Sequence, residues 1–328
     1  MPGQYFLGVD IGATKSHALV ADGEGHATGF GECGPGSYEA VGWEGLQHAL
    51  VTITERALQA ARITKSDIVG AGFGIAGYDW PGELERHRRA VESLGLSAPY
   101  GLVNDTLVGL VTGASQGWGV GVVSGTGCNC WGRDPKGREG HVTGDGDTFG
   151  EYAGGGDIVR RAVQDIARAW SMRGPCTRLT DAFVELAGAT SDVDLLEGLS
   201  MERYTLSAAA APLVFRVAAE GDPVAQEIIR WAGRELANLA IGVIRQLGCE
   251  ALDFEVVQIG SVFNGSPLLG ETMMTKIHEV APGARPVRLM EPPVVGGVLL
   301  GMEQAGIDYP ALRAALTQSV ARLLPLAQ

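Results

Sequence analysis

The chain has 328 residues, with 38 acidic side chains against 25 Lys and Arg, so its net charge is −13. This balance argues against nucleic acid as a main partner, because phosphate backbones recruit clustered basic side chains. Hydrophobic residues at 45% can bury a core, and 49 glycines without a three-residue period exclude a collagen-like chain.

The first 115 residues predict three strands followed by alternating helices and strands. In chain order we expect strands 5–11, 16–22 and 28–32, helix 43–62, strand 68–76, helix 82–93, strand 100–103 and helix 106–112. An alternating order of this kind predicts a mixed sheet with right-handed crossovers.

The remainder begins in the same way. We expect strands 117–124, 129–133 and 140–143, a helical region 150–248, strand 254–259 with a helix after it, strand 287–290, and helices 294–305 and 310–324. The repeated start predicts a duplicated α/β fold with a cleft between two lobes. We assign 1–115 to the first lobe, with helix 307–328 packed back on it, and 116–306 to the second. Trp170 and Trp231 are expected in the helical core.

Glycine-rich turns follow the first strand of each half. The sequence D-x-G-x-T spans Asp10–Thr14, and S-G-T-G spans Ser124–Gly127; a third turn, Gly260-Ser261, follows a later strand. Such turns expose backbone N–H groups that can cradle phosphate oxygens. Asp10, at a strand end, is then placed to hold Mg²⁺ through water. Each turn taken alone could equally be a plain hairpin loop.

Asp105 lies between the two turns in sequence, where a strand enters a helix. It could simply cap that helix. Alternatively, it is a general base that orients and deprotonates an attacking hydroxyl, because phosphoryl transfer needs one carboxylate near its nucleophile.

Together these motifs resemble the actin/hexokinase/Hsp70 ATPase superfamily, whose lobes are ribonuclease H-like. Within it the chain resembles the N-acetylglucosamine kinase branch, grouped with the ATPases of benzoyl-CoA reductase and 2-hydroxyacyl-CoA dehydratase. The matching segments are Ser124–Cys130 (S-G-T-G-C-N-C), Gly140–Asp145 (G-H-x-x-G-D), Gly174–Leu179, Gly260-Ser261 and Gly296-Gly297. The resemblance covers about residues 5–305.

The resemblance implies an ATP-dependent, Mg²⁺-requiring sugar kinase in which Asp105 acts on the 6-hydroxyl of an amino sugar. It places the sugar at Ser37, Gly77, Asp105, Thr126, Asn129 and Asp145. It places the nucleotide at Gly12, Thr14, Lys15, Ser124, Gly125, Thr126, Gly260 and Ser261. Lys15 could also be a solvated side chain. Closure of the lobes over the sugar is expected, because excluding water protects ATP from hydrolysis.

Two departures leave the sugar open. The branch's G-D-E-G-S continues here as Gly144–Thr148, without the glutamate, and Ser37 stands where the kinases carry an asparagine. Hydroxyl and amide groups offer different hydrogen bonds. N-acetylglucosamine, glucosamine, N-acetylmuramic acid and glucose all remain candidates.

Two other functions were weighed: an ATPase that drives electron transfer through a [4Fe–4S] cluster shared by a dimer, and a non-catalytic sensor. Intact Asp10 and Asp105 argue against the sensor. Cys128, Cys130 and His141 make an incomplete zinc set, so packing cysteines are expected. Five scattered cysteines and no secretory or membrane-spanning segment favour a cytoplasmic protein without membrane contact. Apolar faces in the helical region favour a homodimer.

Overall fold

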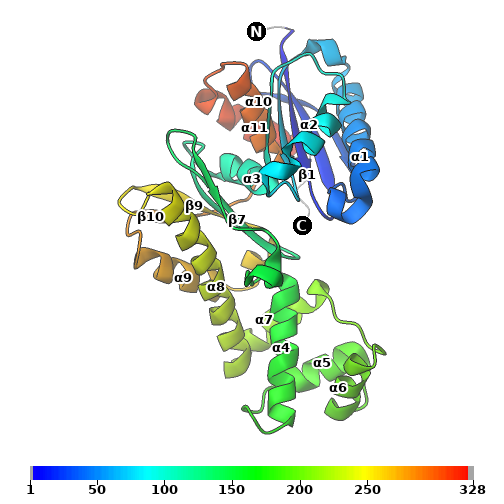
Figure 1. The fold of residues 1–328 in the computed structure, drawn as a ribbon, viewed down its shortest axis with the longest axis vertical. Coiled ribbons are helices and arrows are strands. Elements are labelled where there is room, and N and C mark those ends of the chain that lie inside the picture. The colour runs from blue at the N-terminus through cyan, green and yellow to red at the C-terminus, as the bar shows by residue number, and fades with distance from the viewer. Residues whose placement is uncertain (1–2, 324–328) are drawn as a thin grey trace.

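Two five-stranded mixed sheets form the centres of two lobes in the computed structural model, which describes residues 3–323 (Figure 1). The first sheet has the order β3-β2-β1-β4-β5, from β1 (Tyr5–Ile11), β2 (Ser16–Asp22), β3 (Ala27–Cys33), β4 (Ile68–Ile75) and β5 (Tyr100–Asn104). The second has the order β10-β9-β6-β7-β8, from β6 (Gly119–Ser124), β7 (Cys128–Arg133), β8 (Glu139–His141), β9 (Phe254–Ile259) and β10 (Ala284–Arg288).

The two sheets have the same topology. In each, the first strand pairs antiparallel with the second strand of a hairpin and parallel with a later strand on its other side. The predicted duplication, and with it the actin/hexokinase-like fold class, is therefore confirmed. The carboxyl ends of the parallel strands in each sheet meet at one edge, where ligands of open α/β sheets bind.

Helices cover both faces of the first sheet. The long helix α1 (Tyr38–Ala61), bent at Gly42 where φ is 73°, packs Leu46, Leu50 and Ile53 on one face. The opposite face receives α10 (Val294–Gln304) and α11 (Pro310–Leu323) through a cluster that includes Phe6 and Leu19. Along β1, Phe6 belongs to the cluster under α10, whereas Leu7 and Val9 belong to the cluster under α1. Side chains that point alternately to the two faces are typical of a strand covered on both sides.

The contact between α10 and the first sheet is made by glycines. A Cβ atom added to Gly8 would lie 2.3 Å from the backbone nitrogen of Val298, and one added to Gly72 would lie 2.3 Å from the carbonyl oxygen of Gly297. The helix backbone therefore lies directly on the strands, with no room for a side chain at either position. Much of the glycine excess serves packing of this kind.

One short helix joins the lobes. Helix α3 (Asp105–Gly113) follows β5 and contacts strands of both sheets. Its buried side chains divide between the two: Val108 and Val111 pack with α10, whereas Leu107 and Leu110 pack against β9. The remaining helix of this lobe is α2 (Leu84–Glu92), preceded by the short helix η2 (Pro81–Glu83).

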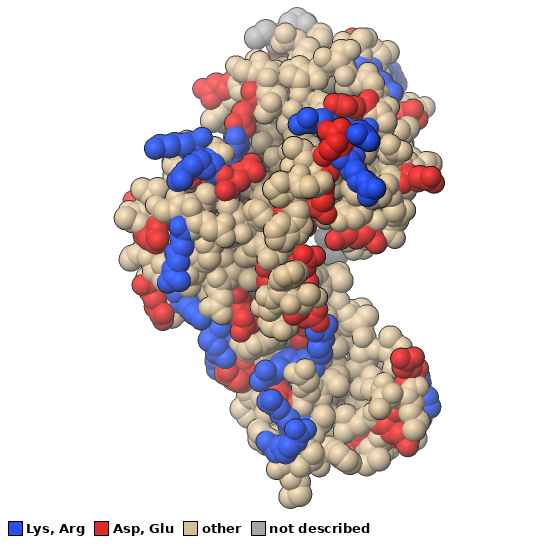
Figure 2. Space-filling view, viewed as in Figure 1, with Lys and Arg blue, Asp and Glu red and all other residues tan. Residues whose placement is uncertain are grey.

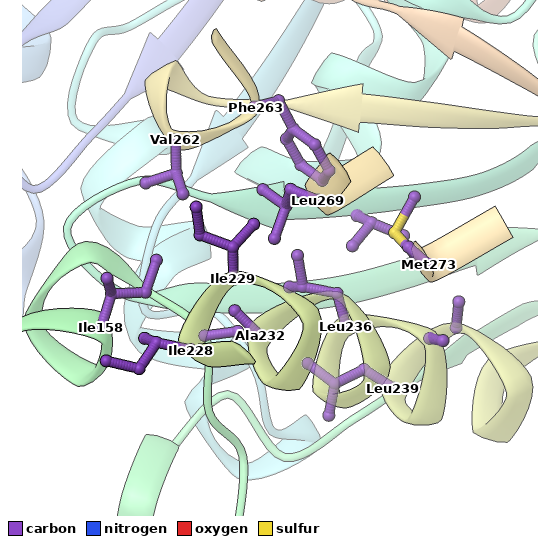
Figure 3. Packing of buried hydrophobic residues seen from close by; sticks show 14 of the residues in the cluster. Ile158, Ile228, Ile229, Ala232, Leu236, Leu239, Val262, Phe263, Leu269 and Met273 are labelled. Atoms are coloured by element: carbon purple, nitrogen blue, oxygen red, sulfur yellow. The ribbon is translucent and has the colours of Figure 1, made fainter. Parts of the chain in front are cut away.

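The second lobe carries the helical region. Its helices are α4 (Gly155–Trp170), α5 (Leu179–Ala187), α6 (Asp192–Ser200), α7 (Ala211–Ala219), α8 (Pro223–Leu247) and α9 (Pro267–His278). Ile229 and Leu236 of α8 face Leu269 and Met273 of α9 in one buried cluster (Figure 3). No helix between residues 3 and 323 has the length and apolarity needed to cross a membrane.

Several sequence-based expectations were wrong in detail. Helix α10 was placed in the second lobe but packs on the first sheet. The Gly296-Gly297 pair, which taken alone predicts a turn, lies inside α10, where an added Cβ on Gly296 would meet the carbonyl oxygen of Val108 at 2.1 Å. Trp170 was expected in the core but is 54% exposed. The last strand ends at Arg288 and not at residue 290. Residues 324–328 of the predicted last helix lie outside the described residues. Apart from α10, the division near residue 115 stays a proposal.

Candidate active site

Asp10 and Asp105 lie at the same edge of the first sheet. Asp10 pairs with Gly74 of β4, which pairs with Val103 of β5, and Asp105 begins α3 two residues later. Two strand spacings, about 10 Å, thus separate Asp10 from Val103, and Asp105 lies beyond Val103 at the same edge. Asn104 caps α3, since its Oδ1 accepts a hydrogen bond from the backbone N–H of Thr106 at 2.8 Å. The capping interpretation of Asp105 is therefore wrong.

Both carboxyl groups have raised pKa values. Burial, followed by the charge of Asp105, raises the pKa of Asp10 to about 8. Burial, followed by the charges of Asp79 and Glu39, raises the pKa of Asp105 to about 7, although backbone N–H groups of Asp105 and Thr106 oppose the shift. A base whose pKa lies near neutral pH is well matched to proton abstraction.

Asp79, which the sequence did not single out, lies between the lobes. Its Oδ1 accepts hydrogen bonds from Asn104 at 3.1 Å and from Asn129 of β7 at 3.0 Å. An added Cβ on Gly144, where φ is +81°, would lie 2.6 Å from its carboxyl carbon. Burial raises the pKa of Asp79, and the amide of Asn129 opposes the shift. This carboxylate brings three chain segments together.

The proposed sugar residues of the first lobe lie in different environments. Ser37 is fully buried and its hydroxyl has no partner, so this hydroxyl is not available to a ligand in this conformation. Gly77, with φ +81°, is packed against Tyr38 and Glu39. Glu39 is exposed over most of its surface, but its carboxyl is partly desolvated. This desolvation, followed by the neighbouring charge of Asp79, raises the pKa of Glu39.

The loop after β8 contains the proposed sugar residue Asp145, which is exposed and receives a long 3.4 Å contact from the indole N–H of Trp80. The loop is fastened by Glu151, which the sequence analysis missed. This buried carboxylate accepts from the backbone N–H and hydroxyl of Thr143 at 2.7 and 2.9 Å and from the N–H of Gly144 at 2.9 Å. A glutamate is thus present at the loop, six residues beyond Asp145.

The first glycine turn closes the β1–β2 hairpin. An added Cβ on Gly12 would lie 2.6 Å from the carbonyl oxygen of Lys15, so the turn has no space for a side chain there. Thr14 and Lys15 are exposed. The carbonyl of Gly12 accepts a 3.0 Å hydrogen bond from the N–H of Gly36, which ties the turn to the segment that precedes α1.

The second turn closes the β6–β7 hairpin and is supported by the start of α4. The N–H groups of Gly155 and Gly156 donate to the carbonyls of Gly125 and Thr126 at 2.8 and 3.2 Å. An added Cβ on Gly154 would lie 2.5 Å from Gly127. The Ser124 hydroxyl donates to a carbonyl at 2.6 Å and is therefore already committed. The glycine run 154–156 allows α4 to touch the turn.

The third turn lies beside the second. Gly260 has φ +102°, and an added Cβ would lie 2.3 Å from the carbonyl oxygen of Ser124. A cavity of about 680 Å³ opens next to these two turns, a size typical of ligand sites. Its walls include Gly125, Thr126 and Ser261 of the turns, Phe215 and Arg216 of α7, and Asn264 and Gly265. The last four residues carry no motif that the sequence analysis could have used.

The donor set fits a magnesium ion. Asp10 offers hard carboxylate oxygens in a half-buried position near the charge of Asp105, where a divalent cation would compensate the like charges. Within residues 3–323 no group of three or more His, Cys, Asp or Glu side chains could hold a metal. The remaining ligands would then be phosphate and water, as is usual for Mg²⁺ at nucleotide sites.

Acidic side chains lie on both sides of the indentation between the upper and lower parts of the molecule (Figure 2). Cys130, by contrast, is fully buried, and burial raises the pKa of its thiol well above the ordinary value. It packs in the apolar cluster of the second lobe.

Taken together, the carboxylates Asp10, Asp79 and Asp105 and the glycine turns define a carboxylate site flanked by backbone turns.

Two sheets of identical order with a glycine hairpin in each define the two-lobed actin/hexokinase-like ATPase fold. The chain belongs to the BadF/BadG/BcrA/BcrD ATPase family, whose model matches residues 7–301.

Two proteins named as amino-sugar kinases are similar over most of their length. N-acetyl-D-glucosamine kinase of Dictyostelium discoideum is 27% identical over 92% of this chain and 99% of its own. N-acetylmuramic acid/N-acetylglucosamine kinase of Clostridium acetobutylicum is 22% identical over the same shares.

Solved structures share the fold. A Chromobacterium violaceum protein provisionally named an N-acetylglucosamine kinase gives a TM-score of 0.68 at 23% identity, over 91% of this chain and 99% of that one. A glucokinase of the ROK family from Streptomyces griseus, solved with glucose and AMPPNP, gives 0.59 at 20% identity over the same shares.

Proposed function

We propose that this protein is an ATP-dependent sugar kinase that phosphorylates the 6-hydroxyl of N-acetylglucosamine or a related amino sugar. The observation that carries the proposal is the position of Asp105, a carboxyl with a pKa near 7 on the helix that joins the lobes. Family membership and the two similar amino-sugar kinases support it.

In the proposed mechanism the cavity beside Gly125 and Ser261 binds the nucleotide, and the turn N–H groups hold its phosphates. Asp105 accepts the proton of the acceptor hydroxyl as its oxygen attacks the γ-phosphorus and ADP leaves. Asp10 would hold Mg²⁺ through water, and the ion would neutralise charge on the phosphates. The Thr126, Asn129 and Asp145 side chains, with Gly77, would bind the sugar.

The sugar's identity depends on the loop after β8 that contains Asp145, which we call the acceptor loop. Glu151 occupies both of its oxygens with Thr143 and Gly144, so the exposed carboxylates of this loop are Asp145 and Asp147, and Asp147 pairs with Arg160. The enclosed Ser37 hydroxyl removes one contact expected for N-acetylglucosamine. We nevertheless rank N-acetylglucosamine and N-acetylmuramic acid first, because the similar kinases are named for these sugars, and keep glucosamine and glucose in the panel.

The test is ADP release across these four sugars, with Asp105→Ala as control. Stimulation by one sugar in the parent, and none in the variant, is the expected result. If no sugar stimulates the parent above the variant, the kinase proposal fails. Iron in the purified protein would instead favour the electron-transfer ATPase. Full activity of Asp105→Ala would remove only the assignment of the base.

The proposal includes a cytoplasmic homodimer. Large apolar side chains are exposed at the carboxyl ends of α4 and α6 in the second lobe, among them Trp170, Met172 and Met201. Exposed apolar patches often mark protein contacts. Light scattering of the purified protein would give the mass of a dimer, and a monomer at every concentration would remove this part.

A further inference from the structure

We propose that Asp79 is a positioning residue for phosphoryl transfer, because its carboxylate joins the base-bearing end of the first sheet to the acceptor-binding strand of the second lobe. This inference rests on the proposed function, since it concerns the distance between Asp105 and the acceptor hydroxyl. Asp79 is not itself assigned a proton-transfer step.

The first connection is to the segment that carries the base. Asn104, 1% exposed, donates through Nδ2 to Asp79 Oδ1 at 3.1 Å and to the carbonyl of Tyr78 at 3.2 Å, while its Oδ1 caps the helix that Asp105 begins. All donors of this amide are used. The orientation of Asn104, and with it the first turn of α3, is therefore fixed by the loop that contains Asp79.

The second connection crosses to the other lobe. Asn129 donates through Nδ2 to the same oxygen of Asp79 at 3.0 Å, and its own Oδ1 accepts from the N–H of Cys130 at 2.8 Å. One N–H of this amide and one lone pair remain for a ligand. Asp79 thus determines which edge of the Asn129 amide faces the acceptor.

The third connection is a packing contact. Gly144 approaches the Asp79 carboxylate so closely that any side chain there would overlap it, and φ at Gly144 favours glycine as well. The acceptor loop before Asp145 therefore rests on Asp79. The loop of Asp79 is itself held, because its backbone N–H and that of Trp80 donate to Glu83 at 3.0 and 2.9 Å.

Asp79 also lies within electrostatic reach of the base, since its charge is one cause of the raised pKa of Asp105. A shared carboxylate of this kind makes the geometry of the closed site depend on one side chain. A misplacement of about 1 Å can cost roughly 100-fold in rate. Water would then compete with the sugar for the phosphoryl group.

The experiment compares the parent with Asp79→Ala and Asp79→Asn, and with Asp222→Asn as a matched control. Asn at position 79 keeps an oxygen that can accept from both amides. Asp222 is another buried carboxylate with several hydrogen bonds, but it caps α8 in the second lobe. The readouts are kcat, KM for sugar and for ATP, and the ratio of ADP to sugar phosphate formed.

We expect Asp79→Ala to lose about 100-fold in kcat, to raise the ratio above one, and to keep KM for ATP within about twofold. Asp79→Asn should recover most of the rate and a ratio near one, and Asp222→Asn should match the parent. Parent kinetics in Asp79→Ala, or equal losses in the control, would overturn the role of Asp79. A parent without sugar-dependent ADP release would instead overturn the proposed function.

A second measurement tests the proposal without the kinetics of Asp79→Ala, in case that variant folds poorly. A double-mutant cycle with Asp79→Leu, which is close in size but removes the accepting oxygen, and Asn129→Ala, followed by urea unfolding, should give non-additive midpoints, because the two native side chains share a hydrogen bond. Additive midpoints would mean that the connection between the lobes contributes nothing.

Discussion

The two hairpin turns occupy the same place in two sheets of the same topology, yet their surroundings differ in charge. Around the first turn, Asp10, Asp79 and Asp105 gather, and two of the three have pKa values of about 7 and 8. Around the second, the start of α4 supplies uncharged backbone contacts through Gly154 and Gly155. The two sheets share a backbone arrangement but not their side chains, and under the proposed function proton and metal chemistry belong mainly to the first lobe and nucleotide binding mainly to the second.

The largest effect should come from the base. Asp105→Asn keeps the shape of the side chain but cannot accept the proton, so kcat should fall by about 100- to 10,000-fold. Nucleotide affinity, which we assign mainly to the cavity beside Gly125 and Ser261 in the second lobe, should stay within about twofold in equilibrium titration. An equal loss of nucleotide affinity would show that the division between the lobes is false.

Asp10→Asn should act on the metal alone. Removing a carboxylate that holds Mg²⁺ through water should weaken the apparent Mg²⁺ affinity by about 10- to 100-fold. Titration of activity against Mg²⁺ measures this, and saturating Mg²⁺ should restore most of the rate. An unchanged Mg²⁺ dependence would remove Asp10 as the metal residue.

In the second lobe, Gly260→Val adds a side chain where φ is +102° and where the new Cβ would lie 2.3 Å from the carbonyl oxygen of Ser124. Strain of about 1–3 kcal/mol is expected. If about 1.4 kcal/mol of this strain weakens ATP binding, KM for ATP rises tenfold. The matched control is Gly221→Val, which also has positive φ but lies in open space outside the site. KM for ATP equal in both variants would contradict the assignment.

The smallest effect should be on pH dependence. Asp105 must be ionised to act, so kcat/KM should rise with pH through about 7. Glu39→Gln removes a negative neighbour, which makes the ionised form easier to reach and lowers the pKa of Asp105. The acid limb should therefore move to lower pH, measured as the profile of kcat/KM. A limb that stays in place, or moves upward, would mean that Glu39 does not act on the base.

Local patterns were enough for the fold and for part of the site. Glycine turns after β-rich runs are short-range signals, and these located Asp10, Gly12 and Gly125 beside the strands that hold them. Asp105 could be singled out because a strand runs directly into a helix there. The interior position of Gly296 could not be read in this way, because a glycine pair is equally typical of a turn and of a close helix contact.

The residues that sequence reasoning missed act through tertiary contacts. Asp79 and Glu151 carry no motif of their own; they matter because folding brings Asn129 and Thr143 to them. For Ser37 the sequence predicts a sugar contact that the structure does not provide, because its hydroxyl is buried. Burial and partner choice are decided by packing between segments far apart in the sequence.

The glycine contact between α10 and the first sheet has a consequence for synthesis. The strands of that sheet end at Asn104, but the helix that covers them begins at Val294. At roughly 5 to 20 residues per second, a ribosome needs about 10 to 40 seconds to make the intervening 189 residues. For that time one face of the sheet, lined by glycines and by Phe6 and Leu19, lacks the cover of α10 and α11, and α3 supplies only part of it. The first lobe can be completed only when synthesis is nearly over, and chaperone binding to the nascent chain should be strongest in that interval.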